Sequence, residues 1–253
     1  MKLLEIRDLT VQYSEKPVID HVSFSLEEGQ WLMIVGPNGA GKSTIVRSIS
    51  GQLPYTGEIL FREQEIRRMK SAQLARHIGV LAQNHAVGYD FTVREIVNLG
   101  RYAHRSGALK GESETDYQAV QKAIRDTGLK ELESKSVLHL SGGEVQRTFL
   151  AQLFAQNPDI MILDEPANHL DLVYQKQVFE MISRWIREPG RAVISVVHDL
   201  SLARAYGTHC LLLDLGDGAI YGTAQEVLTS EHLDAVYEMD VYAWMRQMLG
   251  QWN

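Results

Sequence analysis

The chain has 253 residues, of which 45% are hydrophobic and 23% charged, so it has the composition of an ordinary globular protein and enough length for a large core. Its formal charge of −7 argues against binding to the nucleic-acid backbone or to an anionic lipid surface, and no apolar run is long enough to span a bilayer. With a single cysteine, Cys210, the chain can form neither an internal disulfide nor a cysteine-rich zinc cluster. We expect Cys210 to be a buried strand residue and the protein to lie in the cytoplasm, a reducing compartment.

Residues 2 to 30 predict strands with one face in water. Their apolar side chains are separated by polar ones: Ile6, Leu9 and Val11, followed by Val22, Phe24 and Leu26. We expect these strands and the segment 55–61 to form a small antiparallel β layer beside the main sheet.

Five continuous apolar runs predict strands that are buried on both faces of a mainly parallel sheet. They are Trp31–Val35, Ile78–Ala82, Ile160–Leu163, Ala192–Val197 and Leu211–Leu213. The first four lead directly into Gly36, Gln83, Asp164-Glu165 and His198-Asp199. Because the carboxyl ends of parallel strands meet at one edge of a sheet, where ligands bind, these residues are expected to form one site.

Between residues 86 and 158 the apolar residues recur at helical spacing, which predicts an inserted helical subdomain. The fold class is therefore α/β, and we expect one domain over residues 1–253. Its nucleotide-binding core would comprise residues 1–85 and 159–253, and its helical subdomain residues 86–158.

A phosphate-binding loop is indicated between the first buried run and the helix that follows it. The residues Gly36, Pro37, Asn38, Gly39, Ala40, Gly41, Lys42 and Ser43 fit the pattern G-x-x-x-x-G-K-[ST]. Glycines let backbone N–H groups approach phosphates, Lys42 adds a positive charge, and Ser43 offers an oxygen to Mg²⁺. With Thr44 added, this segment predicts a P-loop NTPase core that binds the phosphates of a nucleotide. The glycine spacing does not fit a dinucleotide-binding loop.

Two carboxylates, Asp164 and Glu165, follow the run Ile160–Leu163. Beside a phosphate loop, such a pair predicts divided roles, with Asp164 holding Mg²⁺ and Glu165 deprotonating the attacking water.

A second anion site is predicted earlier in the chain, at the start of a helix. Ser141 is a good N-cap before two glycines, and the site would comprise Ser141, Gly142, Gly143 and Glu144.

The phosphate loop, the segment Leu140–Glu144 and the Asp164–Glu165 pair together resemble the motifs of ABC-type ATPases, over residues 3 to 225 and in that family's order. The resemblance implies four more roles. Tyr13 would stack on adenine, Gln83 would contact Mg²⁺ and water and sense the membrane partner, Asp171 would cross a dimer interface, and His198 would contact the γ-phosphate.

The resemblance also implies partners. Two copies of the chain would sandwich ATP head to tail, with Ser141–Gly143 of one copy facing Gly36–Ser43 of the other. Two transmembrane permease subunits would dock in a groove formed by residues 83–105, where Asn84, His85, Tyr89 and Phe91 are candidate contacts. A substrate-binding protein would take part indirectly, and no nucleic acid is expected. The ATPase would then lie peripherally on the cytoplasmic face of the membrane.

Residues 91–102 and Pro166–Asp171 resemble ATPases that serve iron–siderophore, haem and cobalamin importers. A molybdate-type importer remains an alternative because it shares these features. A soluble ABC ATPase of the iron–sulfur assembly kind and a small-molecule P-loop kinase are two others. The kinase hypothesis leaves Ser141–Gly143, Gln83 and His198 without roles.

Overall fold

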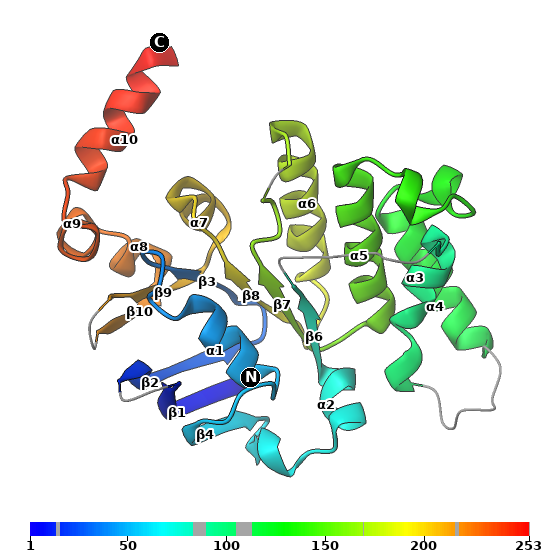
Figure 1. The fold of residues 1–253 in the computed structure, drawn as a ribbon, viewed down its shortest axis with the longest axis horizontal. Coiled ribbons are helices and arrows are strands. Elements are labelled where there is room, and N and C mark those ends of the chain that lie inside the picture. The colour runs from blue at the N-terminus through cyan, green and yellow to red at the C-terminus, as the bar shows by residue number, and fades with distance from the viewer. Residues whose placement is uncertain (14–15, 83–89, 105–112, 169, 216–217, 253) are drawn as a thin grey trace.

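The computed structural model describes residues 1–13, 16–82, 90–104, 113–168, 170–215 and 218–252. A central six-stranded sheet has the order β10-β9-β3-β8-β7-β6, and β9, β3, β8, β7 and β6 run parallel (Figure 1). These strands are β3 (Trp31–Val35), β6 (Ile78–Leu81), β7 (Ile160–Asp164), β8 (Ala192–Val196) and β9 (His209–Leu213). All five apolar runs are therefore confirmed as strands of one parallel sheet. Strand β10 (Ala219–Thr223) was not predicted; it closes one edge of the sheet antiparallel to β9.

A second, antiparallel sheet confirms the predicted N-terminal β layer. Its order is β2-β1-β4-β5, with β1 (Lys2–Gln12), β2 (Pro17–Glu27), β4 (Thr56–Phe61) and β5 (Gln64–Glu65). In each of β1 and β2, two successive buried residues are three positions apart in place of the usual two. The reason is a bulge at Asp8 (φ 54°) in β1 and at His21 (φ 50°) in β2, where the register of the two strands shifts. The bulges return the apolar side chains to the inner face.

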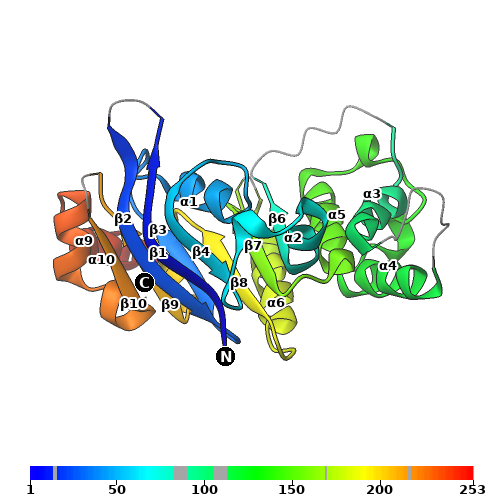
Figure 2. The same ribbon diagram turned by 90° about the horizontal axis from the view of Figure 1, so that it is seen from below.

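Helices cover both faces of the parallel sheet, as Figures 1 and 2 show. They are α1 (Lys42–Ile49), α2 (Ser71–His77), α3 (Val93–Leu99), α4 (Glu114–Asp126), α5 (Gly142–Gln156), α6 (Leu172–Trp185), α7 (Leu200–Tyr206), α8 (Ala224–Val227), α9 (Ser230–Tyr237) and α10 (Val241–Leu249). Short 3₁₀ turns span Ile66–Arg68, Tyr102–His104, Lys130–Leu132, Val137–His139 and Gly250–Trp252.

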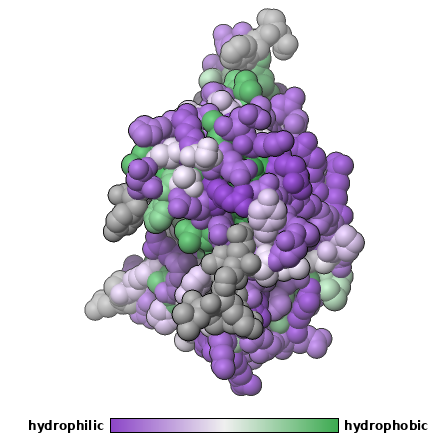
Figure 3. Space-filling model, turned by 90° about the vertical axis from the view of Figure 1, so that its right-hand side faces the viewer, coloured by the Kyte–Doolittle hydropathy of each residue, from purple (hydrophilic) through white to green (hydrophobic). Residues whose placement is uncertain are grey.

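Three clusters of buried side chains hold these layers together. One fills the space between the antiparallel sheet, α1 and the facing side of the parallel sheet. The second joins the opposite side of the parallel sheet to α5, α6 and the C-terminal helices. The third joins α3, α4 and α5, which we call the helical lobe. Figure 3 shows that the outward face of this lobe is largely hydrophilic, as expected of a solvated surface.

Within the part of the chain that the structure describes, no helix combines the length and apolar character needed to cross a membrane.

Cys210 lies on β9, opposite Met33 of β3, and its side chain is fully buried, as predicted. Burial raises the pKa of its thiol to about 12. Because only the thiolate reacts, we expect a thiol reagent at pH 8 to modify the folded chain about 10³-fold more slowly than the same chain in denaturant. Equal rates in the two states, measured by thiol titration, would show that the strand opens readily.

Candidate functional site

The phosphate loop connects β3 to α1, and its glycines adopt conformations that a side chain would block. The φ angles of Gly36, Gly39 and Gly41 are 143°, 91° and 90°. A Cβ on Gly36 would lie 2.4 Å from the carbonyl oxygen of Leu213, and one on Gly41 would lie 2.5 Å from Cδ1 of Ile19. The loop therefore rests directly on β9 and β2, with its backbone N–H groups free of Cβ obstruction.

Lys42 begins α1, and its amino group is folded back into the loop. Its Nζ donates hydrogen bonds to the carbonyl oxygens of Gly36 at 2.7 Å and Pro37 at 2.9 Å, and the residue is only 6% exposed. Burial lowers the pKa of Lys42, whereas the carboxylates of Glu165 and Asp164 act in the opposite direction. A cation therefore lies inside the loop and close to the two predicted catalytic carboxylates.

Asp164 ends β7 beside the phosphate loop. Burial raises the pKa of its carboxyl group, and a hydrogen bond with the Ser43 side chain partly offsets this rise. Its Oδ1 atom is buried and has no hydrogen-bond partner. A buried carboxylate oxygen without a partner is costly, and a cation beside it would compensate. The described residues contain no group of three or more His, Cys, Asp or Glu side chains arranged to hold a metal.

Glu165 follows at once and is held by two side chains. Nε2 of His198, which follows β8, lies 2.6 Å from its Oε1, and the Asn168 amide donates to its Oε2. Its backbone has φ 55°, a left-handed conformation that is unfavourable for glutamate, and its N–H donates to the carbonyl of Val196 at 3.1 Å. The structure thus brings Glu165 and His198 together, as the layout of the strands predicted.

The segment from Ser141 to Glu144 opens α5 as predicted. Ser141 is the N-cap, and it forms a capping box in which its own N–H donates to Oε2 of Glu144 at 2.7 Å. This backbone bond, followed by one from the Ser141 hydroxyl, lowers the pKa of Glu144. Ser141 and Gly142 are exposed, so this helix start is open to a ligand from outside.

Tyr174 of α6 supports this helix start, a role that the sequence did not suggest. A Cβ on Gly143 would lie 2.9 Å from the Tyr174 ring, and the guanidinium of Arg147 lies over the same ring, 5.4 Å from its centroid. The Gln146 amide also donates to the carbonyl of Pro166 at 2.8 Å. The start of α5 is therefore fixed against α6 and the segment after Glu165.

Replacing Gly143 by Ala should cost about 1–3 kcal/mol of unfolding free energy, because the new methyl group would overlap the Tyr174 ring. Gly142 is the matched control: nothing lies within 4 Å of its Cβ position, so Gly142→Ala should be neutral or stabilising by up to about 1 kcal/mol. Urea unfolding of the nucleotide-free chain measures both changes. Equal effects of the two substitutions would contradict this packing.

The remaining predicted residues have mixed outcomes. Tyr13 follows β1 and is 56% exposed, so its ring is open to stacking. Asp171 is the N-cap of α6, with Oδ1 accepting the Tyr174 N–H at 2.9 Å. Gln83, Asn84, His85 and Tyr89 lie outside the described residues, so their predicted roles stay predictions.

Arg101, in the predicted docking groove, is an internal residue. Its Nε donates to Asp116 at 2.8 Å, its Nη1 donates to the carbonyl of Ala155 at 2.8 Å, and its side chain is 11% exposed. Reversing its charge would break a buried ion pair, so that change cannot test docking. Phe91 of the same segment is 39% exposed.

The two anion-binding surfaces lie apart in a single chain. Figure 1 places α1 and the phosphate loop on one side of β7 and β6, and α5 on the other side; the turned view in Figure 2 agrees.

Comparisons with known proteins agree on one family. The family model described as "ABC transporter" matches residues 19–168, more than half of the chain. The ferric enterobactin transport ATP-binding protein FepC of Escherichia coli (strain K12) is 37% identical over 230 residues, which are 90% of this chain and 84% of FepC. The uncharacterized ABC transporter ATP-binding protein YvrA of Bacillus subtilis (strain 168) is 36% identical over 96% of this chain, and the chain spans 55% of YvrA.

Among solved structures, an inward-facing conformation of a putative metal-chelate type ABC transporter matches with a TM-score of 0.82 at 26% identity. The match covers 94% of this chain and 90% of the solved chain. Sequence and structure comparisons therefore identify the same kind of protein.

Proposed function

Because the chain belongs to the family of ABC transporter ATP-binding proteins, we propose that it is the ATP-hydrolysing subunit of an importer for a metal chelate, such as an iron–siderophore, haem or cobalamin. One observation carries the enzymatic part. Lys42 lies inside the phosphate loop, and both Asp164 and Glu165 lie close enough to influence its pKa. The site therefore combines a phosphate cradle with a carboxylate base, which hydrolysis of a phosphoanhydride requires.

We assign the positioning of the attacking water to Glu165 and His198. Oε1 of Glu165 is 2.6 Å from Nε2 of His198, so the imidazole orients the carboxylate that would accept the proton of the attacking water. Gln83 would complete this group. Tyr13 and residues 36–44 would hold the nucleotide.

Magnesium fits the residues that are present. The buried, unpartnered Oδ1 of Asp164 and the adjacent Ser43 hydroxyl are oxygen groups of the kind that Mg²⁺ prefers, and phosphate oxygens and water would supply the remaining ligands. When bound, Mg²⁺ supplies positive charge to the β- and γ-phosphates. Ser43, Asp164 and Gln83 are the protein groups that we propose to hold it.

We propose that two copies assemble head to tail around ATP. The start of α5 at Ser141 and Gly142 is exposed and offers N–H groups to an anion. The phosphate loop of a second copy would present that anion. Glu144, which completes the capping box of α5, and Asp171, the N-cap of α6, would also lie in this interface.

The division into a core (1–85 and 159–253) and a helical subdomain (86–158) is part of the same proposal. The separate cluster of buried side chains in the helical lobe supports it. The division would also have a function: the lobe carries Ser141–Gly143, and as a separate unit it would turn these residues toward the partner copy.

The predicted docking region, residues 83–105, lies partly outside the described residues, and we propose that permease docking extends from it onto a groove of the core. A groove of about 760 Å³ lies between the end of α1, α2 and β6, directly before residues 83–89. Its apolar lining includes Leu53, Met69, Leu74 and Val80. A short amphipathic helix from a transmembrane subunit would cover these side chains. The protein would then lie on the cytoplasmic face of the membrane, with the substrate-binding protein on the opposite side.

Replacing Leu74 by Arg should reduce recovery of the permease with the ATPase by at least tenfold, because a charge would replace a side chain that the docked helix covers. Leu249→Arg is the matched control, since Leu249 is 65% exposed on α10, outside this groove. The ATPase rate of each isolated variant reports on folding. Equal recovery with both variants would remove the groove from the proposal.

The proposal as a whole is tested by purifying the Glu165→Gln variant with ATP from detergent-solubilised membranes. Recovery of a polytopic permease supports the importer, and its binding protein then identifies the chelate or, alternatively, an oxyanion such as molybdate. Recovery of soluble partners alone would favour a non-transport ABC ATPase. Transfer of phosphate to a metabolite without release of free phosphate would favour a kinase.

A further inference from the structure

Helix α6 begins with two apolar side chains that the chain itself leaves uncovered. Leu172 and Val173 follow the N-cap Asp171, and no large apolar side chain of the described residues is more exposed than Leu172, at 82%. The first turn of a helix favours acidic side chains, and this one contains none. The exposed leucine therefore brings no benefit to the isolated chain, whereas contact with another molecule would remove it from water.

A small pocket, which we call the α6–α7 pocket, lies between these two helices and the end of β8. Phe179 of α6 and Val196 of β8 line it and are fully buried, and Leu202 of α7 lines it as well. Its volume is about 120 Å³. Removal of one leucine side chain from a protein core leaves a cavity of similar size, roughly 150 Å³. One leucine side chain would therefore fill the pocket.

The exposed leucine and the pocket share one side of α6. Leu172, Gln175 and Phe179 are spaced i, i+3 and i+7, so they lie along the same stripe of the helix, and the last two line the pocket. At 82% exposure, Leu172 does not fill the pocket of its own chain. In a two-fold symmetric pair the same surface of each chain meets the other, so each leucine can face the partner's pocket.

The position of this surface indicates a second copy of the chain as the occupant. Asp171, directly before Leu172, is assigned above to the head-to-tail interface. Glu165 and His198, assigned above to ATP hydrolysis, also line the pocket. The leucine and the pocket are thus continuous with the surface that the ATP-bound assembly would cover, and the inference rests on the proposed function.

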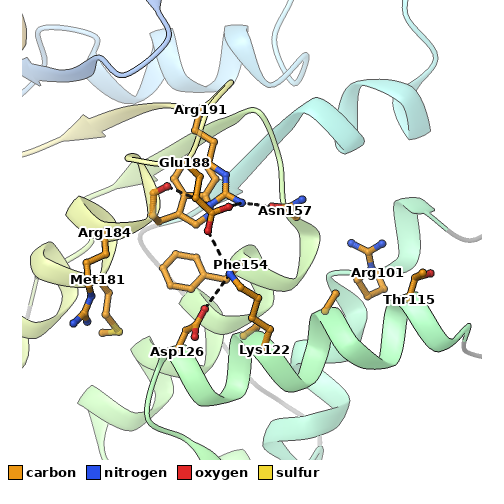
Figure 4. Close-up of a pocket in the computed structure, with 13 residues that line it drawn as sticks. Arg101, Thr115, Lys122, Asp126, Phe154, Asn157, Met181, Arg184, Glu188 and Arg191 are labelled. Carbon is orange, nitrogen blue, oxygen red and sulfur yellow. Dashed lines mark hydrogen bonds and ion pairs between the residues drawn. The ribbon is translucent and has the colours of Figure 1, made fainter.

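A larger cavity beside α6 suits a leucine poorly. It has a volume of about 690 Å³ and borders the last turns of α6, at Met181 and Trp185, on the side of the helical lobe (Figure 4). Ion pairs of Glu188 with Lys122 at 3.4 Å and with Arg191 at 2.6 Å lie along it. A single leucine would leave most of this space empty and would face charged groups.

The α6–α7 pocket also adjoins the pair that would position the attacking water. Oε1 of Glu165 and Nε2 of His198 are 2.6 Å apart, and Asp199, which follows His198, is the N-cap of α7. A leucine seated between α6 and α7 would hold the start of α7, and with it His198, in place. Association of two copies would then favour hydrolysis.

We propose that Leu172 of each copy inserts into the α6–α7 pocket of the other copy, so that two apolar contacts hold the ATP-bound pair together in addition to the shared nucleotide. Each contact covers one side chain, far less surface than a stable dimer needs. The contacts therefore act together with ATP, and the nucleotide-free chain stays monomeric.

The test uses the full Glu165→Gln chain with ATP and Mg²⁺, and sedimentation equilibrium to measure the dissociation constant of the dimer. Leu172→Ala should raise this constant at least tenfold, because both leucine contacts are lost. Leu172 is exposed in the single chain, so the variant should fold normally. Leu249→Ala is the matched control, since Leu249 is an exposed leucine on α10 outside the pocket, and it should change the constant less than twofold.

A second variant fills the pocket from inside the chain. Leu202→Phe would place a ring in it and should raise the dissociation constant at least fivefold, with urea unfolding as the check on the fold. Combined with Leu172→Ala, it should weaken the dimer no more than the stronger of the two single changes, because one contact cannot be lost twice. Effects that multiply would show that the leucine and the pocket act separately, against the proposal.

In the chain that keeps Glu165, Leu172→Ala should slow phosphate release per chain at about 1 μM protein and much less at about 50 μM, because a higher concentration restores association. A purely structural defect would slow release equally at both concentrations.

The outcomes separate this inference from the proposed function. If Glu165→Gln dimerises with ATP and Leu172→Ala leaves the dissociation constant within twofold of the Leu249→Ala value, the leucine contact is overturned and the head-to-tail assembly stands. If Glu165→Gln stays monomeric with ATP, the assembly itself fails, and the leucine contact fails with it.

Discussion

Replacing Glu165 by Gln is expected to slow ATP turnover by about 10²–10⁴-fold while leaving ATP binding intact, because an amide keeps the shape of the carboxylate and cannot accept the proton of the attacking water. Glu165 contacts His198 through Oε1 and Asn168 through Oε2, and glutamine keeps an oxygen at one of these two positions. Phosphate release under saturating ATP measures the loss. ATP titration by calorimetry checks the binding.

The same variant should accumulate as an ATP-bound dimer, since hydrolysis is what would release the two copies. Size-exclusion chromatography with light scattering, with and without ATP, reports the mass. Glu180→Gln is the matched control: Glu180 lies on α6, is 48% exposed, and makes only a distant ion pair with Lys176. If the Glu165→Gln chain stayed monomeric with ATP and Mg²⁺, the head-to-tail assembly would be refuted.

Replacing Lys42 by Ala should weaken ATP binding by about 10- to 100-fold, because hydrogen bonds to a charged group contribute roughly 1.5–3 kcal/mol. The change removes a cation that is buried inside the phosphate loop, and it also leaves the carbonyl oxygens of Gly36 and Pro37 without their donor. Looser loop geometry adds to the lost charge. Calorimetric titration with ATP is the measurement.

Lys176→Ala is the control for Lys42→Ala, since Lys176 begins the exposed ion pair on α6 and its side chain is 72% exposed. Thermal unfolding separates loss of binding from loss of fold: both variants should unfold as cooperatively as the unchanged chain. Undiminished ATP affinity in Lys42→Ala would place the nucleotide elsewhere.

The parallel sheet was the most predictable part of the fold, for a physical reason. A strand covered on both faces must be apolar throughout, so β3, β6, β7 and β8 each appear as a continuous apolar run that a small or polar residue ends. The edge strand β10 was missed because it is half exposed and lacks such a run. The short helix α2 was missed because none of its residues is buried, so no apolar period marks it.

The candidate site was predictable where one short segment carries all of its chemistry, as in Gly36–Ser43 and Asp164–Glu165. It was not predictable where two distant segments act together. Gly143 and Tyr174 are 31 positions apart, and nothing near either residue in the sequence indicates that the ring covers the glycine. The hydrogen bonds of Lys42 to its own loop were also missed, because the motif describes the loop with phosphate bound.

Because the backbone at Glu165 is left-handed, the residue that favours thermal stability at this position differs from the residue that ATP hydrolysis needs. A glycine could hold φ 55° without the roughly 1–2 kcal/mol that this conformation costs an L-residue, so the folded chain would gain stability at the moment it lost its base. Laboratory selection for thermal tolerance alone would therefore tend to discard the glutamate. Only a selection that also requires ATP hydrolysis, such as growth that depends on uptake, would keep the glutamate.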